Sequence, residues 1–173
     1  MKKEISNENL RHVVHTFQPV VDQNSRILIL GSVPSVKSME EQFYYMHPQN
    51  RFWKILGNLF NKDLFNFTLN DKIDFLISNH IALYDSVYEC DILGSSDNKI
   101  FNVVPSNIEL LIKNTHITHI FLNGTASFYI FKKYTHNLLN ISSKLPSTSP
   151  ANATYTFDKL LEEWKAILDC YDD

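Results

Sequence analysis

Apolar residues occur along the chain in short runs with two different periodicities. Residues 26–32 contain the continuous apolar run Ile-Leu-Ile-Leu, which stops at Gly31. Such a run is typical of a parallel strand that is covered on both faces. Residues 50–60 instead carry apolar side chains three and four positions apart, the spacing of a helix that packs one face against a core.

Strand and helix patterns alternate to the end of the chain. The expected elements are a helix near residues 10–17, a strand at 26–32, helices at 50–60 and 68–79, a strand at 81–85, a helix at 106–114, a strand at 117–122, a helix at 125–134, a strand at 140–145 and a long amphipathic helix that Thr156 caps. We expect Ser106 and Glu109 to form a capping box. This order predicts one α/β domain over residues 1–173, a three-layer sandwich in which a short, mostly parallel sheet of about four strands is flanked by helices.

The carboxyl ends of the predicted parallel strands are the expected place for a ligand. Right-handed crossovers put these ends at one edge of the sheet, where open α/β sheets bind their ligands. The residues expected there are 31–35, Asp85, Ser86, Asn123, Gly124 and 146–150. A further stretch, residues 94–98, is expected to form an exposed loop beside this edge.

Charge and cysteine content narrow the classes of function. The 173 residues include 16 lysines and arginines against 19 aspartates and glutamates, and the net charge of −3 excludes a generally basic nucleic-acid-binding surface. Any DNA site must therefore be local. Cys90 and Cys170 show no CxxC pattern, so we expect a cytoplasmic setting and no zinc site. No apolar run approaches the roughly 18 residues of a membrane span, so we expect neither secretion nor membrane anchoring.

The motifs that are missing exclude several enzyme classes. The four glycines form neither a GxGxxG nor a GxxxxGK[ST] pattern, so we expect no nucleotide cofactor. A GxSxG elbow is also missing, but Ser32 or Ser35 with His47 and Asp85 keeps a serine-type hydrolase open as an alternative. His12 and His15 would share a helix face without a third ligand, so we expect no metal site.

Two segments carry a specific resemblance. Residues 47–54, His-Pro-Gln-Asn-Arg-Phe-Trp-Lys, look like the HPxNRFWK signature of mismatch-specific uracil-DNA glycosylases, and residues 145–152, Leu-Pro-Ser-Thr-Ser-Pro-Ala-Asn, narrow the match. Together they resemble the hypoxanthine-DNA glycosylase branch of the uracil-DNA glycosylase superfamily, over roughly residues 27–164. The resemblance implies the superfamily fold and an enzyme without metal or cofactor. Such an enzyme flips a deaminated nucleotide out of damaged DNA and hydrolyses its N-glycosidic bond.

The resemblance also assigns the residue that positions the attacking water. In the uracil-specific branches an Asp or Asn at the second position of the first loop does this, but here the position is Ser32, whose hydroxyl is too short. In the hypoxanthine branch the asparagine of the HPxN run takes the role, and Asn50 matches it. An amide is no strong general base, so Asn50 is expected to orient water by hydrogen bonds. The alternative is that Asn50 only caps the helix starting at Arg51.

Several residues are expected to bind the flipped base. Tyr45 aligns with an aromatic residue that stacks on the base, or is an ordinary core tyrosine. His47 contacts the base or holds the turn. Asp85 would accept the N1–H of hypoxanthine and repel adenine, which has only a lone pair at N1; the alternative is a cap for the next turn. Backbone N–H groups of the first loop would meet O6. The residues of that loop included in the predicted site are Gly31, Ser32, Pro34 and Ser35.

The second motif segment is expected to contact the DNA backbone. Its small hydroxyl side chains on a rigid turn suit phosphates flanking an extruded nucleotide, although a solvated loop would have the same composition. Gly124 would allow a tight turn beside the base pocket, and Asn123 contacts substrate or serves the turn. The residues expected at DNA are Lys144, Ser147, Thr148, Ser149 and Pro150.

We therefore expect a monomeric DNA glycosylase that releases hypoxanthine from deoxyinosine in damaged DNA. A glycosylase for uracil or mismatched thymine is the alternative within the same class. A serine-type hydrolase and a non-catalytic protein that binds DNA lesions are the alternatives outside it.

Overall fold

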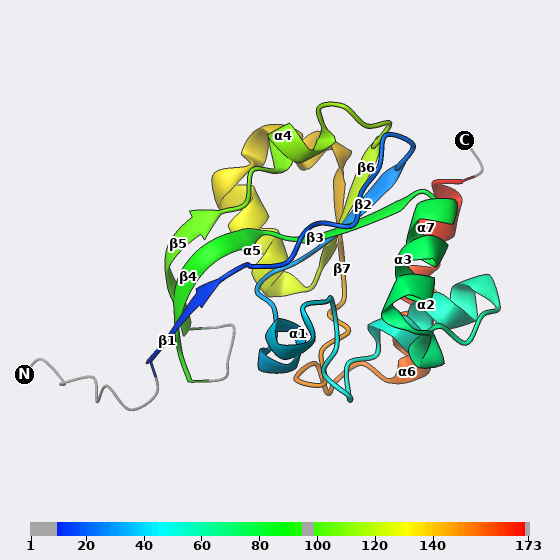
Figure 1. The fold of residues 1–173 in the computed structure, drawn as a ribbon, viewed down its shortest axis with the longest axis horizontal. Coiled ribbons are helices and arrows are strands. Elements are labelled where there is room, and N and C mark those ends of the chain that lie inside the picture. The colour runs from blue at the N-terminus through cyan, green and yellow to red at the C-terminus, as the bar shows by residue number, and fades with distance from the viewer. Residues whose placement is uncertain (1–9, 95–98, 172–173) are drawn as a thin grey trace, which may run out of the picture.

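The computed structural model describes residues 10–94 and 99–171 and has an α/β fold (Figure 1). Its central sheet has four parallel strands in the order β3-β2-β6-β7. They are β2 (Ile27–Gly31), β3 (Ile81–Asp85), β6 (His119–Asn123) and β7 (Ser142–Leu145). The predicted short parallel sheet is confirmed. Residues 95–98 of the expected exposed loop lie outside the described residues.

Helices cover both faces of this sheet (Figure 1). They are α1 (Val36–Glu41), α2 (Phe52–Phe60), α3 (Leu69–Ser78), α4 (Ile108–Ile112), α5 (Thr125–Tyr134), α6 (Phe157–Trp164) and α7 (Ala166–Asp169), with 3-10 turns at η2 (Leu64–Asn66) and η4 (His136–Ile141). Successive side chains of a strand point to opposite faces. Ile27 and Ile29 of β2 therefore pack with residues of α2, α3 and α6, whereas Leu28 and Leu30 pack with residues of α4 and α5. The three-layer sandwich is confirmed.

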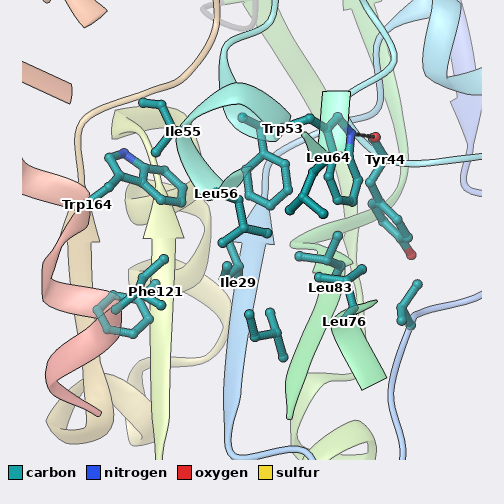
Figure 2. Close-up of a cluster of buried hydrophobic side chains, with 14 of the residues drawn as sticks. Ile29, Tyr44, Trp53, Ile55, Leu56, Leu64, Leu76, Leu83, Phe121 and Trp164 are labelled. Atoms are coloured by element: carbon teal, nitrogen blue, oxygen red, sulfur yellow. Dashed lines mark hydrogen bonds between the residues drawn. The ribbon is translucent and has the colours of Figure 1, made fainter. Parts of the chain in front are cut away.

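Two tryptophans connect the larger apolar cluster to the loops that carry the motifs (Figure 2). Trp53 and Trp164 are both almost fully buried. The indole N–H of Trp53 donates to the carbonyl of Tyr44 at 3.0 Å, and that of Trp164 donates to the carbonyl of Pro146 at 3.0 Å. Because a buried indole N–H needs an acceptor, each contact fixes one loop against the core. The two motif segments thus rest on rigid structure.

A second, antiparallel sheet was not expected from the sequence. It contains β1 (Leu10–Val14), β4 (Val87–Leu93) and β5 (Ile100–Pro105) in the order β1-β4-β5. The prediction of a helix near residues 10–17 is therefore wrong, and His12 and His15 share no helix face. Val13 pairs with Cys90 across the sheet. Long-range pairing of this kind, together with β-branched valines, outweighs a local spacing that resembles a helix.

The helix ends agree with the sequence in one case and differ in another. Thr156 caps α6, since its side chain accepts a hydrogen bond from the N–H of Lys159. The capping box at Ser106 and Glu109 is wrong, because α4 starts later and the side chain of Asn107 accepts from the N–H of Leu110. The long C-terminal helix is split into α6 and α7. None of the helices within residues 10–94 and 99–171 has the length and apolar character needed to cross a membrane.

Candidate active site

The carboxyl ends of the parallel strands bring the predicted site residues to one edge of the sheet. β2 and β3 end in register at Gly31 and Asp85, and β6 and β7 end in register at Asn123 and Leu145. In Figure 1, α1 and the loop that follows β7 lie on the same side of the sheet. The shared edge is confirmed, and the binding roles of its residues stay predictions.

Arg51 holds the two motif segments together. Its guanidinium donates hydrogen bonds of 2.5–3.3 Å to four backbone carbonyls of the loop after β7, those of Thr148, Ser149, Asn152 and Tyr155. Partial burial lowers the pKa of Arg51, but a guanidinium keeps its charge at neutral pH. Hydrogen bonds from a charged donor are stronger than neutral ones. Arg51 belongs to the first motif segment, but the sequence does not indicate that its hydrogen-bond partners lie in the second one.

Asn123 supports the same loop from the sheet. Its amide N–H donates to the hydroxyl of Thr148 at 3.0 Å, and its oxygen accepts the N–H of Thr148 at 3.0 Å. Thr148 is fully buried, so we assign it to the support of the loop rather than to DNA contact. Gly124 has φ +95°, and a Cβ added there would lie 2.8 Å from the Cβ of Ser147. Glycine therefore allows the close approach of the two turns.

The rest of the loop remains available to a ligand. Ser147 and Ser149 are half-buried, and each hydroxyl oxygen accepts a hydrogen bond from the N–H two residues later, at 3.1 and 3.2 Å. No residue that the structure describes accepts the proton of either hydroxyl. Pro150 and Lys144 are exposed, and the Lys144 ammonium lies 5.8 Å from the ring centroid of Phe128.

Asn50 uses one end of its amide to start α2. Its Oδ1 atom accepts the backbone N–H of Phe52 at 2.9 Å. A backbone N–H pairs only with an acceptor, so this bond fixes which end of the amide faces the helix. Nδ2 makes no hydrogen bond to any residue that the structure describes. α2 starts at Phe52 and Arg51 is its N-cap residue, so Asn50 forms a turn one residue before the cap, and the other end of its amide can donate to a water molecule.

Tyr45 lies against the end of β2. Its ring stacks on Phe52 with a centroid distance of 4.0 Å, so a base could stack only on its opposite face. A Cβ added at Gly31 would overlap Oδ1 of Asp85 and lie 3.2 Å from the Tyr45 hydroxyl. That hydroxyl is buried and forms no hydrogen bond of good geometry with a described residue, although the Asn123 amide is near. Burial raises the pKa of Tyr45, and the charge of Asp85 adds to the effect.

The first loop and His47 are held by local hydrogen bonds. Ser35 caps α1, since its hydroxyl accepts the N–H of Ser38 at 3.1 Å and donates to the hydroxyl of the same residue at 3.1 Å. Nδ1 of His47 accepts the N–H of Gln49 at 3.2 Å, so a neutral ring carries its proton on Nε2. Ser32 is 8% exposed. Ser35 is thus bonded within its own helix turn and not to His47.

Asp85 has a partner that sequence reasoning missed. Its Oδ2 lies 2.8 Å from Nε2 of His15, with both side chains buried. Nδ1 of His15 lies 3.0 Å from the carbonyl oxygen of Phe17. No local pattern could have found this pair, because it depends on the pairing of β1 with β4. Within residues 10–94 and 99–171, no three His, Cys, Asp or Glu side chains are grouped so that they could hold a metal ion.

Comparison with known proteins assigns the family. The model of the Uracil DNA glycosylase superfamily matches residues 18–169, which include both motif segments and all four strand ends. The chain belongs to this superfamily. The resemblance of the two motifs is confirmed, and the protein is a DNA N-glycosylase with damaged DNA as its substrate.

Individual relatives of this glycosylase come from two archaea. It is 31% identical to a protein of Methanosarcina acetivorans named hypoxanthine DNA glycosylase, over 87% of this chain and 95% of that protein. It is 39% identical to a protein of the same name from Methanosarcina barkeri, over 49% of this chain and 53% of that protein, so this match spans about half of that relative. A solution NMR structure of a candidate uracil DNA glycosylase from Methanosarcina acetivorans superimposes with a TM-score of 0.75, at 31% identity, over 87% of this chain and 93% of that chain.

Proposed function

We propose that this DNA glycosylase releases hypoxanthine from deoxyinosine and leaves an abasic site. The observation that carries the proposal is the position of Asp85, a carboxylate at the carboxyl end of β3 whose Oδ1 lies against the backbone of Gly31. The name hypoxanthine DNA glycosylase, which the two archaeal relatives bear, agrees with it. The protein is proposed to act as a monomer in the cytoplasm, the setting favoured by a chain with two cysteines and no CxxC pattern.

Base recognition follows from the polarity of the groups at Gly31. Hypoxanthine presents an N1–H donor beside its O6 acceptor, whereas adenine presents a lone pair at N1 beside an amino group. Oδ1 of Asp85 accepts the N1–H, and the Tyr45 hydroxyl, a buried donor beside the same glycine, is suited to O6. Adenine reverses both polarities. The Tyr45 hydroxyl can still accept from the amino group, but Oδ1 of Asp85 then faces the lone pair of N1 and is left unpaired, which is costly. Deamination therefore changes a rejected base into an accepted one.

Hydrolysis uses Asn50 to place water at the sugar. Because Oδ1 of Asn50 is bonded to the N–H of Phe52, the group that remains is Nδ2, a donor. Nδ2 holds a water molecule through its oxygen and cannot remove a proton from it. The glycosidic bond largely breaks first, so hypoxanthine departs as an anion and the sugar has oxocarbenium character. The water then adds to the sugar carbon, and the proton that it loses neutralises the departed base. Ser32 is too short for this task.

The DNA backbone is held by the loop after β7. The free protons of the Ser147 and Ser149 hydroxyls are suited to phosphate oxygens on either side of the flipped nucleotide, and Lys144 adds a positive charge. The two hydrogen bonds between Asn123, at the end of β6, and Thr148 keep this loop in place. A local arrangement of this kind is what a protein with net charge −3 requires for DNA binding.

Single-turnover base release tests the proposal. Labelled duplexes that differ only in one deoxyinosine, deoxyuridine, G·T-mismatched thymidine or deoxyadenosine are incubated with the wild-type protein and with Asn50→Ala, and abasic sites are cleaved by alkali. We expect rapid cleavage of the deoxyinosine duplex by the wild type alone, and no cleavage at deoxyadenosine. Faster release of uracil or thymine would favour the alternative within the class. If the wild type yields no abasic sites at deoxyinosine, the proposed substrate is wrong.

A further inference from the structure

The side chain of His15 is enclosed behind the predicted base-reading group. Its ring is fully buried and the Asp85 side chain is 6% exposed, with Nε2 and Oδ2 2.8 Å apart. Three aromatic rings surround the imidazole, with centroids at 4.2 Å for Phe17, 4.9 Å for Tyr84 and 6.0 Å for Tyr44. Water therefore has little access to the contact between His15 and Asp85, and the two groups must satisfy each other.

The hydrogen bonds of His15 determine how many protons the pair holds. Nδ1 faces the carbonyl of Phe17, which only accepts, so Nδ1 carries a proton. Nε2 and Oδ2 of Asp85 then share one further proton. If it lies on Nε2, Asp85 is a carboxylate; if it lies on Oδ2, Asp85 is a carboxylic acid whose O–H points at the imidazole. In both arrangements Oδ1 of Asp85 presents lone pairs alone.

We infer that His15 is a specificity-determining positioning residue, which keeps Oδ1 of Asp85 a hydrogen-bond acceptor by holding the shared proton on the far side of the carboxyl group. This inference rests on the proposed function. It explains how a buried carboxyl group can discriminate hypoxanthine from adenine even when it is protonated. Without His15, a protonated Asp85 could carry its proton on Oδ1 and donate to N1 of adenine.

The other titratable groups around the pair do not compete for this proton. They are the phenols of Tyr44 and Tyr45, on the loop between α1 and α2, and of Tyr84 in β3, all of which lie near Asp85. Burial, with a contribution from the charge of Asp85, raises the pKa of all three, so they stay neutral at neutral pH. The Tyr44 hydroxyl donates away from the pair, to the carbonyl of Gln18 at 2.8 Å.

Two amide variants separate the two hydrogen bonds of His15. In His15→Asn the side-chain nitrogen takes approximately the place of Nδ1, which keeps the bond to Phe17 but does not reach Asp85. In His15→Gln the nitrogen takes approximately the place of Nε2 and donates to Oδ2 of Asp85. The measured quantities are the single-turnover rates of base release from deoxyinosine and deoxyadenosine duplexes at several pH values. Affinity for a duplex with an abasic site, which has no base to read, reports whether each variant is folded.

We expect His15→Asn to lose about tenfold or more in the deoxyinosine rate near neutral pH, the size of one lost hydrogen bond to a charged group. Its release of adenine should rise above the wild-type level, and the pH profile of its deoxyinosine rate should differ from that of the wild type. His15→Gln should recover most of the selectivity, with a pH profile like that of the wild type. Both variants should bind abasic DNA as the wild type does.

The outcomes distinguish this inference from the proposed function. If the wild type releases no hypoxanthine, the proposed function fails and the inference fails with it. If the wild type is active and the two variants have equal selectivity and equal pH profiles, the inference alone is overturned. A variant that no longer binds abasic DNA while its partner variant does assigns His15 a structural role and also overturns the inference.

Discussion

Replacing Asn50 separates the two tasks that its amide performs. Asn50→Ala removes both the acceptor for the N–H of Phe52 and the donor proposed to hold water. Asn50→Ser keeps an acceptor, since serine forms a similar though weaker turn, but has no group at the position of Nδ2. The two variants should therefore differ in stability and agree in activity.

The structure sets the size of each effect. One hydrogen bond of 2.9 Å starts α2, and loss of such a bond at the beginning of a helix costs about 1 kcal/mol. For a chain of 173 residues this lowers the melting temperature by about 2–4 °C. Loss of one donor aimed at the reacting groups reduces a chemical step by about 100- to 1000-fold.

Thermal unfolding and single-turnover release of hypoxanthine measure the two effects on the same samples. Asn50→Ala should lose both stability and activity, whereas Asn50→Ser should recover most of the stability and none of the activity. If Asn50→Ser releases hypoxanthine within about tenfold of the wild-type rate, the Nδ2 group is not needed, and the role assigned to Asn50 is refuted.

Three further predictions concern other contacts. Arg51→Met should lower the free energy of unfolding, measured by urea titration, by about 3 kcal/mol, because four carbonyls lose a charged donor. It should also abolish base release. Unchanged stability would contradict the view that Arg51 holds the two motif segments together. Tyr45→Phe should raise the free energy of unfolding by about 1 kcal/mol, since it removes a buried hydroxyl without a hydrogen-bond partner. It should nevertheless release hypoxanthine more slowly than the wild type. Equal rates of the variant and the wild type would show that the hydroxyl does not take part in base recognition. The pKa of His12 is raised by its hydrogen bond to Asp91, so its contribution to stability is complete below its ordinary pKa and is lost as pH rises through the folded value. His12→Ala should therefore reduce the urea midpoint more at about pH 5 than at about pH 8, and an equal reduction at both would contradict this linkage.

The central sheet could be predicted because its strands are buried on both faces. Residues 27–30 of β2 must then be apolar without interruption, and the same run indicates a strand with no knowledge of its neighbours. The second sheet could not be predicted in this way. β1 is buried only in part, and its partner β4 is distant in the chain, since Val14 pairs with Glu89 and Leu10 with Leu93. Its apolar positions fit helical spacing, so the local pattern favoured the wrong element.

The motifs identified candidate site residues in the sequence but not the contacts that these residues make. Strand order predicted the position of Asp85 at the sheet edge, and the motif identified Asn50, but neither indicated the hydrogen-bond partners of these residues. The capping alternative for Asn50 came close, since Asn50 accepts the N–H of Phe52 from one residue before the N-cap Arg51, whereas His15 reaches Asp85 across 70 positions of the chain. Thr148 was expected at DNA because its residue type suits phosphate, and its burial against Asn123 depends on tertiary packing that composition does not encode.

The hydrogen bonds of Arg51 couple two parts of the site. Arg51 follows Asn50 directly in the chain, and its guanidinium donates to the backbone carbonyl of Ser149 in the second motif segment. The turn proposed to hold the attacking water and the segment proposed to contact the phosphates are therefore rigidly connected. We expect that DNA bound in the wrong position on this segment also displaces the water, which would make correct binding of the DNA backbone a condition for release of the base.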